Sequence, residues 1–351
     1  MIGELLVRAD VSENVGAGHV MRGLTLAAEW VRRGGRAILL CAVPPPGITE
    51  RAITAGVELQ RVDASAGSEA DLARMVVLAS SRHSGRSPLW IALDGYGFSF
   101  DYQARLRNAG GRVLVIDDTA HQPRYSADVI LNQNGGADDL VYCANSDTRL
   151  LLGPRFALLR PEFRSIRTPP RPVQARIENV LITFGGSDPA NYTVRTLRAL
   201  RQQGLTSVAL RTVLGPANVH SAAVRSEIAL WPNPGHVLLE DARDVSRHMA
   251  WADLAIGAAG STVWELACCG LPAVLFVTAG NQERSAAAAE ASGVALNLGE
   301  WSDGRTEEQL ARAINLRLAS AEVRTSMAER GHALVDGCGA ERVVNVLTAL
   351  H

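Results

Sequence analysis

The sequence predicts an α/β protein built from two doubly wound, Rossmann-like domains that face each other across a central cleft. Short apolar runs typical of buried strands alternate with longer helical patterns in both halves of the chain, and this alternation favours parallel sheets covered by helices. A proline- and arginine-rich stretch separates the halves. The length of 351 residues exceeds what one hydrophobic core usually supports, which also favours two domains.

The first half begins with a predicted strand at residues 4–10. A helix from about His19 to Arg33 follows, because apolar residues recur at helical spacing until two glycines interrupt the pattern. Further strand-like runs in this half cover residues 37–43, 88–96, 112–118 and 127–133.

The alternation stops between residues 160 and 178 and then restarts. Strand-like runs in the second half cover residues 179–186, 208–215, 236–240, 252–260 and 272–278, and helices are expected near 306–333 and 338–350. We therefore expect a first domain at residues 1–165, a linker at 166–178 and a second domain at 179–351, with the last helix able to cross back to the first domain.

Composition excludes several classes of partner. The chain has 35 Lys and Arg residues against 36 Asp and Glu residues, a formal net charge of -1 and a pI of about 6.7, so no basic field attracts nucleic acid or anionic lipid. The five cysteines lack paired metal-ligand spacing, and no segment is typical of a signal peptide or a membrane span. We expect a soluble cytoplasmic monomer that binds a small molecule and needs neither a metal nor a cofactor.

The run GAGHVMR, residues 16–22, puts His19 directly behind a glycine turn, where the first strand gives way to the first helix. Ligands of α/β enzymes bind at this edge of a sheet, and the helix start favours an anion and a neutral imidazole, the form that a general base needs. Two alternatives are a histidine that only caps or packs, and a dinucleotide-binding turn. The dinucleotide fingerprint is incomplete, because Met21 replaces its third glycine and no acidic residue ends the second strand.

Further candidate residues follow two neighbouring strands. Asp94 and Tyr96 lie in the run ALDGYG, whose glycines allow close approach of a ligand, and one of the two is expected to orient His19 or its water. Asp117 and Asp118 end the next strand. They are expected as turn or cap carboxylates; a metal site is the alternative, which the lack of an accompanying His or Glu cluster disfavours.

The run FGGSDPAN in the second half predicts a phosphate cradle. Gly185, Gly186 and Ser187 lie between a strand and a helix, with Pro189 at the expected first helical position. An ordinary capped turn is the alternative.

The run GAAGSTVWE makes a stronger prediction of the same kind. Gly260, Ser261 and Thr262 form a loop whose backbone N–H groups can hold a diphosphate. Glu265 either grips a ribose diol or completes a capping box with Thr262.

Two amides follow the next strand. Asn281 and Gln282 can bond sugar hydroxyl or acetamido groups, or they can cap the helix that begins there.

Six ordered motifs spread over nearly the whole chain carry a family resemblance. They are RAD with GAGHVMRGLTLA, DGYG, IDD with ADVILNQN, LLGPRFALLRPEF, FGGSDPAN, and GAAGSTVWELACCGLP with GNQ. These motifs resemble the PseG family, the UDP-sugar hydrolases of pseudaminic acid (nonulosonic acid) biosynthesis, and the second half is similar to the wider GT-B nucleotide-sugar enzymes such as MurG. The resemblance implies a GT-B architecture with UDP held mainly by the second domain. It also implies metal-independent hydrolysis of UDP-2,4-diacetamido-2,4,6-trideoxy-β-L-altrose to UDP and free sugar, with anomeric inversion.

The resemblance also implies roles for single residues. His19 would be the catalytic base, Tyr96 would lie near the reacting sugar, Glu265 would bind ribose, and the backbone near Leu239 and Glu240 would meet uracil. The catalytic set is therefore His19, Tyr96 and Asp94. The expected substrate-binding residues are Asn14, Gly16, Gly18, Arg22, Gly185, Gly186, Ser187, Leu239, Gly260, Ser261, Thr262, Glu265, Asn281 and Gln282.

A single base suffices for this chemistry, because a phosphate ester ionises with a second pKa of about 6 and UDP leaves without much protonation. His19 would hold water on the face of the sugar opposite UDP. Three alternatives are a GT-B glycosyltransferase with a UDP-sugar donor, a hydrolase of a related nucleotide-sugar, and a binding module without catalysis.

Overall fold

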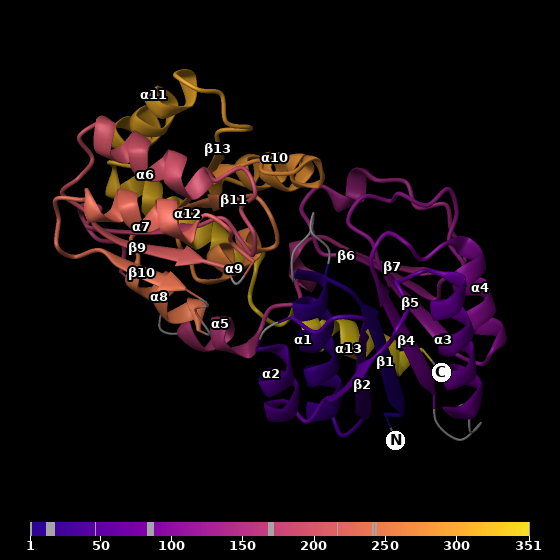
Figure 1. Ribbon diagram of the computed structural model, residues 1–351. Helices are drawn as coiled ribbons and strands as arrows, with labels where there is room; N and C mark the ends of the chain where they lie inside the picture. The colour runs from indigo at the N-terminus through magenta and orange to yellow at the C-terminus, as the bar shows by residue number, and fades with distance from the viewer. Residues whose placement is uncertain are drawn as a thin grey trace. The chain divides into compact units, whose positions relative to one another are not determined.

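The computed structural model describes residues 2–11, 18–45, 47–82, 88–167, 172–215, 217–240, 242 and 244–350. Its contacts divide the chain into two compact units, Met1–Arg160 together with Cys338–His351, and Pro161–Gly337. Each unit contains its own parallel sheet (Figure 1). Across the described ranges, no helix has the length and apolar character that crossing a lipid bilayer requires.

The first unit has a sheet of seven described strands in the order β3-β2-β1-β4-β5-β6-β7. The strands are β1 (Glu4–Ala9), β2 (Arg36–Cys41), β3 (Glu58–Arg61), β4 (Leu89–Asp94), β5 (Arg112–Ile116), β6 (Val129–Asn132) and β7 (Arg149–Leu152). The helices are α1 (Gly18–Arg32), α2 (Ile48–Thr54), α3 (Glu69–Arg82), α4 (Phe100–Asn108), α13 (Gly339–Ala349) and the short 3-10 segments η1 (Ala137–Asp139) and η2 (Pro154–Phe156).

Helices cover both faces of this sheet, because successive strand residues point to opposite sides. Leu5 and Val7 join a core with α1, α2 and α13, whereas Leu6 joins a second core with α3 and α4. Val343 and Leu347 of α13 are fully buried in the first of these cores. Figure 1 shows α13, in yellow, among the indigo elements of the first unit. The chain therefore completes the first unit's core with its last helix.

The second unit has a sheet of six described strands in the order β10-β9-β8-β11-β12-β13. The strands are β8 (Asn179–Thr183), β9 (Ala209–Leu214), β10 (Val237–Glu240), β11 (Leu254–Ala258), β12 (Ala273–Phe276) and β13 (Ala295–Asn297). The helices are α5 (Pro161–Ile166), α6 (Tyr192–Gln202), α7 (Ser221–Ala229), α8 (Val245–Trp251), α9 (Thr262–Cys268), α10 (Glu283–Ala291), α11 (Arg305–Arg312) and α12 (Ala321–Leu334), with the short 3-10 segment η3 (Gly280–Gln282) and the π-helical segment η4 (Ala313–Arg317).

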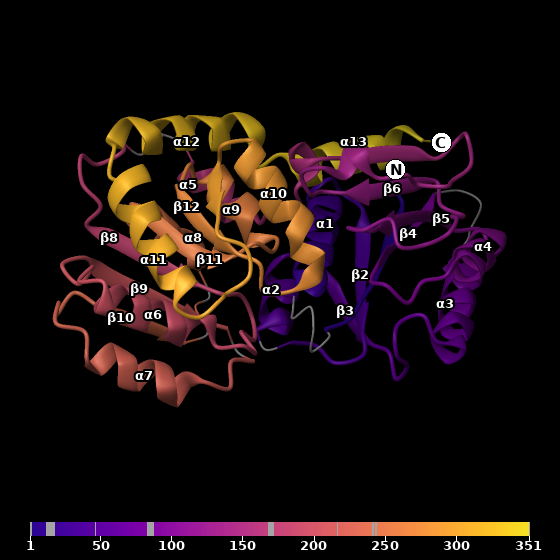
Figure 2. The ribbon, with the colours of Figure 1, turned by 90° about the horizontal axis from the view of Figure 1, so that it is seen from above.

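This second sheet is also covered on both faces. Helices α6, α7 and α11 pack on a core that includes Ile182 and Ile256, while α8 and α9 contact β8 and β11, and α12 packs against α9. Figure 2 views the same layers from above. In both sheets the order reverses once, between β1 and β4 and between β8 and β11, and ligands of doubly wound folds bind where the loops part at such a reversal.

The structure confirms the predicted fold class, two Rossmann-like parallel sheets, and adds elements that the sequence did not predict. Strands β3, β7 and β13 form sheet edges and were missed. Helix α5 occupies the start of the proline-rich stretch, with Pro161 as its first residue, where the fixed φ of proline suits a helix start.

Candidate active site

The first unit brings a histidine and a carboxylate together at its sheet reversal. His19 is the second residue of α1, and Asp94 ends β4. The Nδ1–H of His19 donates to Asp94 Oδ1 across 2.6 Å, and the two side chains are 8% and 0% exposed. A carboxylate only accepts, so this contact assigns a proton to Nδ1. In the neutral ring Nε2 is then the acceptor nitrogen. The pair has the arrangement of a general base held by an orienting acid.

Arg22 fixes the orienting carboxylate from the other side. Its guanidinium donates to both oxygens of Asp94, at 2.5 and 2.7 Å, and to both oxygens of Asp118, at 3.0 and 2.9 Å. Burial alone would raise the pKa of Asp94, but Arg22 and His19 outweigh it and bring that pKa to about 2. Asp94 is therefore an ionised acceptor at neutral pH.

The structure shows the protein partners of Arg22. The sequence predicts Arg22 as a substrate-binding residue. Its side chain is 8% exposed and pairs with Asp94 and Asp118. Asn134 Nδ2 also donates to Asp118, at 2.8 Å. Arg22 thus fixes the carboxylate of Asp94, which in turn contacts His19.

Tyr96 lies beside His19 in the loop after β4. Its ring centroid is 5.8 Å from that of His19, with an interplanar angle of 69°, and the residue is 37% exposed. The loop is held by a close backbone approach: a Cβ on Gly67 would stand 2.1 Å from the carbonyl oxygen of Gly97, so only glycine fits. Tyr96 is therefore presented next to the candidate base by tightly packed backbone.

A buried arginine network supports the same loops. Arg8 donates to Asp10, at 2.6 and 2.9 Å, and to Asp71, at 2.8 Å. Asp10 accepts the backbone N–H of Ala66, and Asp71 accepts that of Gly67. The network ties the end of β1 to the loop that abuts Gly97, which gives Arg8 and Asp10 a structural role.

Two expected residues, Asn14 and Gly16, lie outside the described residues, and Gly18 is the first residue of α1. The carboxylates of Asp117 and Asp118 have separate protein partners. Asp118 pairs with Arg22, whereas Asp117 accepts from His121 and Tyr125.

Sequence reasoning missed His121, because it looked for metal-ligand clusters and found none. The available signal was a histidine four residues after Asp117, in a loop that follows a strand.

In the second unit, two glycine loops approach each other at the end of the sheet. A Cβ on Gly215, after β9, would stand 2.4 Å from Gly186 Cα, whereas a Cβ on Gly185 would meet nothing within 4 Å. Gly185 has a φ of +80°, which favours glycine. Gly185, Gly186 and Ser187 thus form a turn with open space over its first residue.

The helix after this turn begins later than expected. The sequence placed Pro189 at the first helical position, but α6 begins at Tyr192 with Asn191 as its N-cap. Asp188 is buried and accepts the N–H groups of Tyr192 and Thr193, at 2.8 and 2.9 Å. These bonds explain the shift, since two helix donors are satisfied by a residue before the helix.

The loops after β11 and β12 form the other side of the reversal in the second sheet. A Cβ on Gly257 would stand 2.3 Å from the carbonyl oxygen of Thr183, so glycine is required where β11 meets β8. A Cβ on Gly260 would lie 3.7 Å from Gln282 Nε2, which shows that these loops adjoin. Gln282 Oε1 accepts from the backbone and hydroxyl of Thr278, so part of this amide orders its own loop.

The remaining expected residues lie on several elements of this unit. Ser261 is the N-cap of α9 without a side-chain capping bond, so the predicted capping box beginning at Thr262 does not describe this helix start. Glu265 is half-buried in the first turn of α9, and Asn281 is exposed in η3. Leu239 lies on the edge strand β10, in register with Val213.

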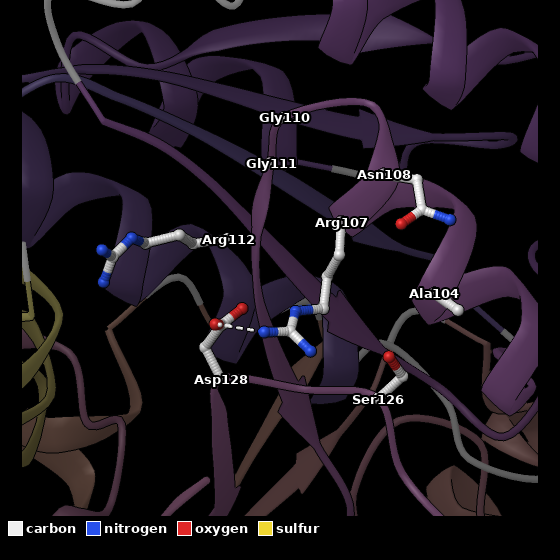
Figure 3. Close-up of a pocket in the computed structure, with 8 residues that line it drawn as sticks. All are labelled: Ala104, Arg107, Asn108, Gly110, Gly111, Arg112, Ser126 and Asp128. Carbon is white, nitrogen blue, oxygen red and sulfur yellow. Dashed lines mark hydrogen bonds and ion pairs between the residues drawn. The ribbon is translucent and has the colours of Figure 1, made fainter. Parts of the chain in front are cut away.

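A cavity of about 440 Å³ lies elsewhere in the first unit (Figure 3). Its lining includes Arg107 and Asp128, which pair at 3.1 Å, and Arg112, which donates to the carbonyl oxygen of Leu350. Arg107 and Asp128 precede β5 and β6, and Arg112 is the first residue of β5, so the cavity lies at the amino edge of the sheet, opposite the edge of His19. The cavity is thus separate from the candidate site.

Comparisons with known proteins agree with this architecture. Residues 180–337 match the glycosyltransferase family 28 C-terminal domain. The spore coat polysaccharide biosynthesis protein SpsG of Bacillus subtilis is 30% identical over 240 residues, which cover 68% of this chain and 69% of SpsG.

Solved structures show the same fold at low sequence identity. MurG of Acinetobacter baumannii has a TM-score of 0.65 at 17% identity, with 99% of each chain covered. The UDP complex of MnaA from S. aureus has a TM-score of 0.65 at 11% identity, with 99% of this chain and 96% of that chain covered. The fold is therefore GT-B, and the chain belongs to the family of the spore coat polysaccharide biosynthesis protein SpsG.

Proposed function

We propose that the protein hydrolyses a UDP-linked sugar to UDP and free sugar, with His19 as the general base. The observation that carries this proposal is the contact between His19 Nδ1 and the buried carboxylate of Asp94, which leaves Nε2 able to take a proton from water. Two findings support a nucleotide-sugar substrate. The chain shares a family with a polysaccharide biosynthesis protein, and its second half matches the glycosyltransferase family 28 C-terminal domain.

The second unit would hold UDP. The turn at Gly185, Gly186 and Ser187 and the loop at Gly260–Thr262 offer backbone N–H groups at the sheet reversal, where anions bind in doubly wound folds. Glu265 would accept from the ribose hydroxyls and the backbone at Leu239 would meet uracil. The amides of Asn281 and Gln282 would contact the sugar or the diphosphate.

In the proposed reaction, His19 Nε2 removes a proton from water as the water oxygen attacks the anomeric carbon. The bond between that carbon and the UDP oxygen breaks, and its electron pair leaves with UDP. Attack from the face opposite UDP inverts the anomeric configuration. Arg22 and Asp94 keep the imidazole in the tautomer and orientation that this step needs. Tyr96 lies beside the imidazole, where the sugar would approach.

The substrate we propose is UDP-2,4-diacetamido-2,4,6-trideoxy-β-L-altrose, in pseudaminic acid biosynthesis, because the six motifs of the sequence resemble the hydrolases that act on it. A glycosyltransferase with a UDP-sugar donor is the second candidate. The match to a glycosyltransferase C-terminal domain favours it.

An NMR time course in EDTA and without acceptor separates the two candidates. It follows the UDP phosphates and the sugar anomeric proton, with the diacetamido substrate in one tube and UDP-GlcNAc in another. We expect UDP and sugar of inverted configuration from the first substrate alone, and a loss of turnover of about 10² to 10⁴ in His19→Ala with UDP binding retained. Intact donors that still bind would favour the transferase, and full activity of His19→Ala would disprove the base assignment.

A further inference from the structure

A second imidazole lies one strand further along the first sheet. His121 follows β5, and its Nδ1 is 2.8 Å from Asp117 Oδ2. The side chain of Asp117 is fully buried, while that of His121 is 25% exposed. The first unit therefore holds two carboxylate–imidazole pairs at the carboxyl ends of neighbouring strands, and the function proposed above uses only the pair of His19 and Asp94.

The second ring nitrogen of His121 also meets an acceptor. Its Nε2 lies 3.0 Å from the backbone carbonyl oxygen of Tyr96. A carboxylate and a carbonyl can only accept, so both contacts are hydrogen bonds together only when both ring nitrogens carry protons. The side-chain nitrogen of Gln122 lies 2.7 Å from Nε2. Nitrogen and oxygen of an amide are assigned from the hydrogen-bond network, and beside a protonated Nε2 the amide is turned by 180° so that its oxygen accepts.

The surroundings of His121 favour this cation. The hydrogen bond to Asp117 raises the pKa of His121 above its usual value of 6.5, against the opposing effect of burial. Asp117 itself accepts from the Tyr125 hydroxyl, at 2.5 Å, and from the backbone N–H of Thr119, at 2.9 Å. Burial raises the pKa of Asp117, but these bonds and His121 outweigh it and lower that pKa.

The other charged groups near this loop have their own partners. Asp118 is paired with Arg22, and the guanidinium of Arg124 stacks 3.8 Å from the ring centroid of Phe100. Asp117 is thus the charge that acts directly on His121.

The ring of Tyr96 lies between the two imidazoles. Its centroid is 5.8 Å from that of His19 and 5.2 Å from that of His121, and both contacts are edge-to-face, at 69° and 82°. On one side the Tyr96 loop abuts Gly67, and on the other it is held by the imidazole of His121. His121 therefore contacts both the backbone and the ring of Tyr96, the residue beside the candidate base.

We propose that His121 is a positioning residue whose imidazolium bridges Asp117 and the Tyr96 carbonyl, holds the Tyr96 ring against His19, and releases it on deprotonation. The structural part of this inference stands without the proposed function, whereas its effect on catalysis rests on that function. The sign follows from the bonds: the bridge is complete at low pH and is lost as the pH rises through the raised pKa of His121.

Imidazole NMR on the whole protein tests the coupling directly. The chain has eight histidines, so ring signals can be assigned by single substitutions. We expect the His19 ring protons, which lie near the Tyr96 ring, to show an additional inflection at the pH where His121 titrates. Asp117→Asn should move the titration of His121 and the additional inflection in the His19 signals to lower pH together. His121→Phe keeps an aromatic ring in place and should abolish the additional inflection.

The matched control is His236→Phe. His236 also meets a backbone carbonyl, that of Asn233, at 3.0 Å, but belongs to the second unit. This variant should leave the His19 titration unchanged. The proposal would be overturned if the His19 ring-proton shifts of the wild type showed no additional inflection. It would also be overturned if that inflection persisted unchanged in Asp117→Asn and His121→Phe.

A kinetic measurement tests the consequence for the reaction. If UDP-sugar hydrolysis is observed, His121→Phe should lower kcat about tenfold to a hundredfold, because the group beside the base is misplaced. It should also remove the alkaline decline of kcat that we expect for the wild type. The dissociation constant of UDP should stay within about twofold, since UDP is assigned to other loops. An unchanged kcat and alkaline limb would overturn the catalytic part. Wild-type protein without hydrolysis would instead refute the proposed function and leave the NMR result to decide the positioning role.

Discussion

At the scale of single residues, the hydrogen-bond partners of each ionisable side chain in the candidate site limit the role that it can have. Arg22 donates to Asp94 and Asp118, so its charge helps to hold the Asp94 carboxylate ionised. Asp94 in turn accepts the Nδ1 proton of His19. In the neutral ring of His19, Nε2 is the nitrogen that does not face Asp94, and the proposed base assignment rests on it.

Glu265 is the residue whose two interpretations differ most sharply in their consequences. If it binds ribose, Glu265→Gln should raise the dissociation constant of UDP roughly tenfold to a hundredfold, as expected for the loss of a hydrogen bond to a charged group. The midpoint of thermal unfolding should then change little. Calorimetric titration with UDP and a thermal unfolding curve measure the two quantities on the same sample.

Glu322→Gln is the matched control, because Glu322 is also acidic and lies in the first turn of a helix, α12, of the same unit. It should leave the UDP affinity unchanged. If Glu265→Gln lowers the unfolding midpoint and leaves the UDP dissociation constant as it was, Glu265 stabilises its own helix and does not bind ribose.

At the scale of elements, the site depends on backbone contacts between loops from different strands. The loop after β3 touches the loop after β4 at Gly67 and Gly97, and the loops after β8 and β9 touch at Gly186 and Gly215. Such contacts place candidate ligand-binding turns without any side chain.

Gly67→Ala should separate the loop of Tyr96 from its support. Gly67 has a φ of +81°, and the added Cβ would meet the Gly97 carbonyl oxygen at 2.1 Å, so positive-φ strain and steric overlap together should cost about 3 kcal/mol of unfolding free energy. The turnover number should fall with it, because Tyr96 shifts relative to His19. Urea unfolding and steady-state kinetics provide the measurements.

The control variant Gly204→Ala carries the positive-φ strain of Gly67→Ala without its steric overlap. Gly204 has a φ of +72°, and a Cβ there would meet nothing within 4 Å, so this variant should lose only about 1–2 kcal/mol and keep its turnover. Equal losses in the two variants would show that the contact between Gly67 and Gly97 adds nothing.

At the scale of the whole molecule, burial along the strand and strand length together separate most of the predicted strands from the missed ones. The central strands β1, β4, β5, β8 and β11 are buried along nearly their whole length and appear in the sequence as apolar runs. The edge strand β3 carries charged and half-exposed residues, so backbone pairing defines it and no apolar run reveals it. The missed strands β7 and β13 contain apolar residues, but they are only four and three residues long.

The candidate site could also be predicted only in part from the sequence. His19, Asp94 and Tyr96 could be found because strand ends in a doubly wound fold meet at one edge. The partners of Arg22 could not, since its distances to Asp94 and Asp118 depend on helix α1 packing over two separate strand ends. His121 was missed for a related reason: its function depends on a carbonyl 25 residues away in the sequence.

The two units should also respond differently to acid. In the first unit burial raises the pKa of Asp10, Asp94 and Asp117, but their hydrogen-bond and charge partners outweigh it, so these pKa values lie below the usual range. These carboxylates must take up protons when the unit unfolds in acid, so the stability that they contribute is present above pH 4 and is lost as the pH falls through their folded-state values. For Asp94, a pKa lowered from 3.8 to about 2 corresponds to about 2 kcal/mol. Asp188 in the second unit has the opposite sign, because burial raises its pKa.

We therefore expect the first unit to unfold at a higher pH than the second when the protein is titrated from pH 6 to pH 2 at constant temperature. Tryptophan indole N–H signals in NMR spectra can follow each unit, because Trp30 and Trp90 are fully buried in the first and Trp264 is fully buried in the second. The signals of Trp30 and Trp90 should disappear first. Simultaneous loss of all three signals, or loss of Trp264 first, would show that the carboxylates of the first unit do not govern its acid stability.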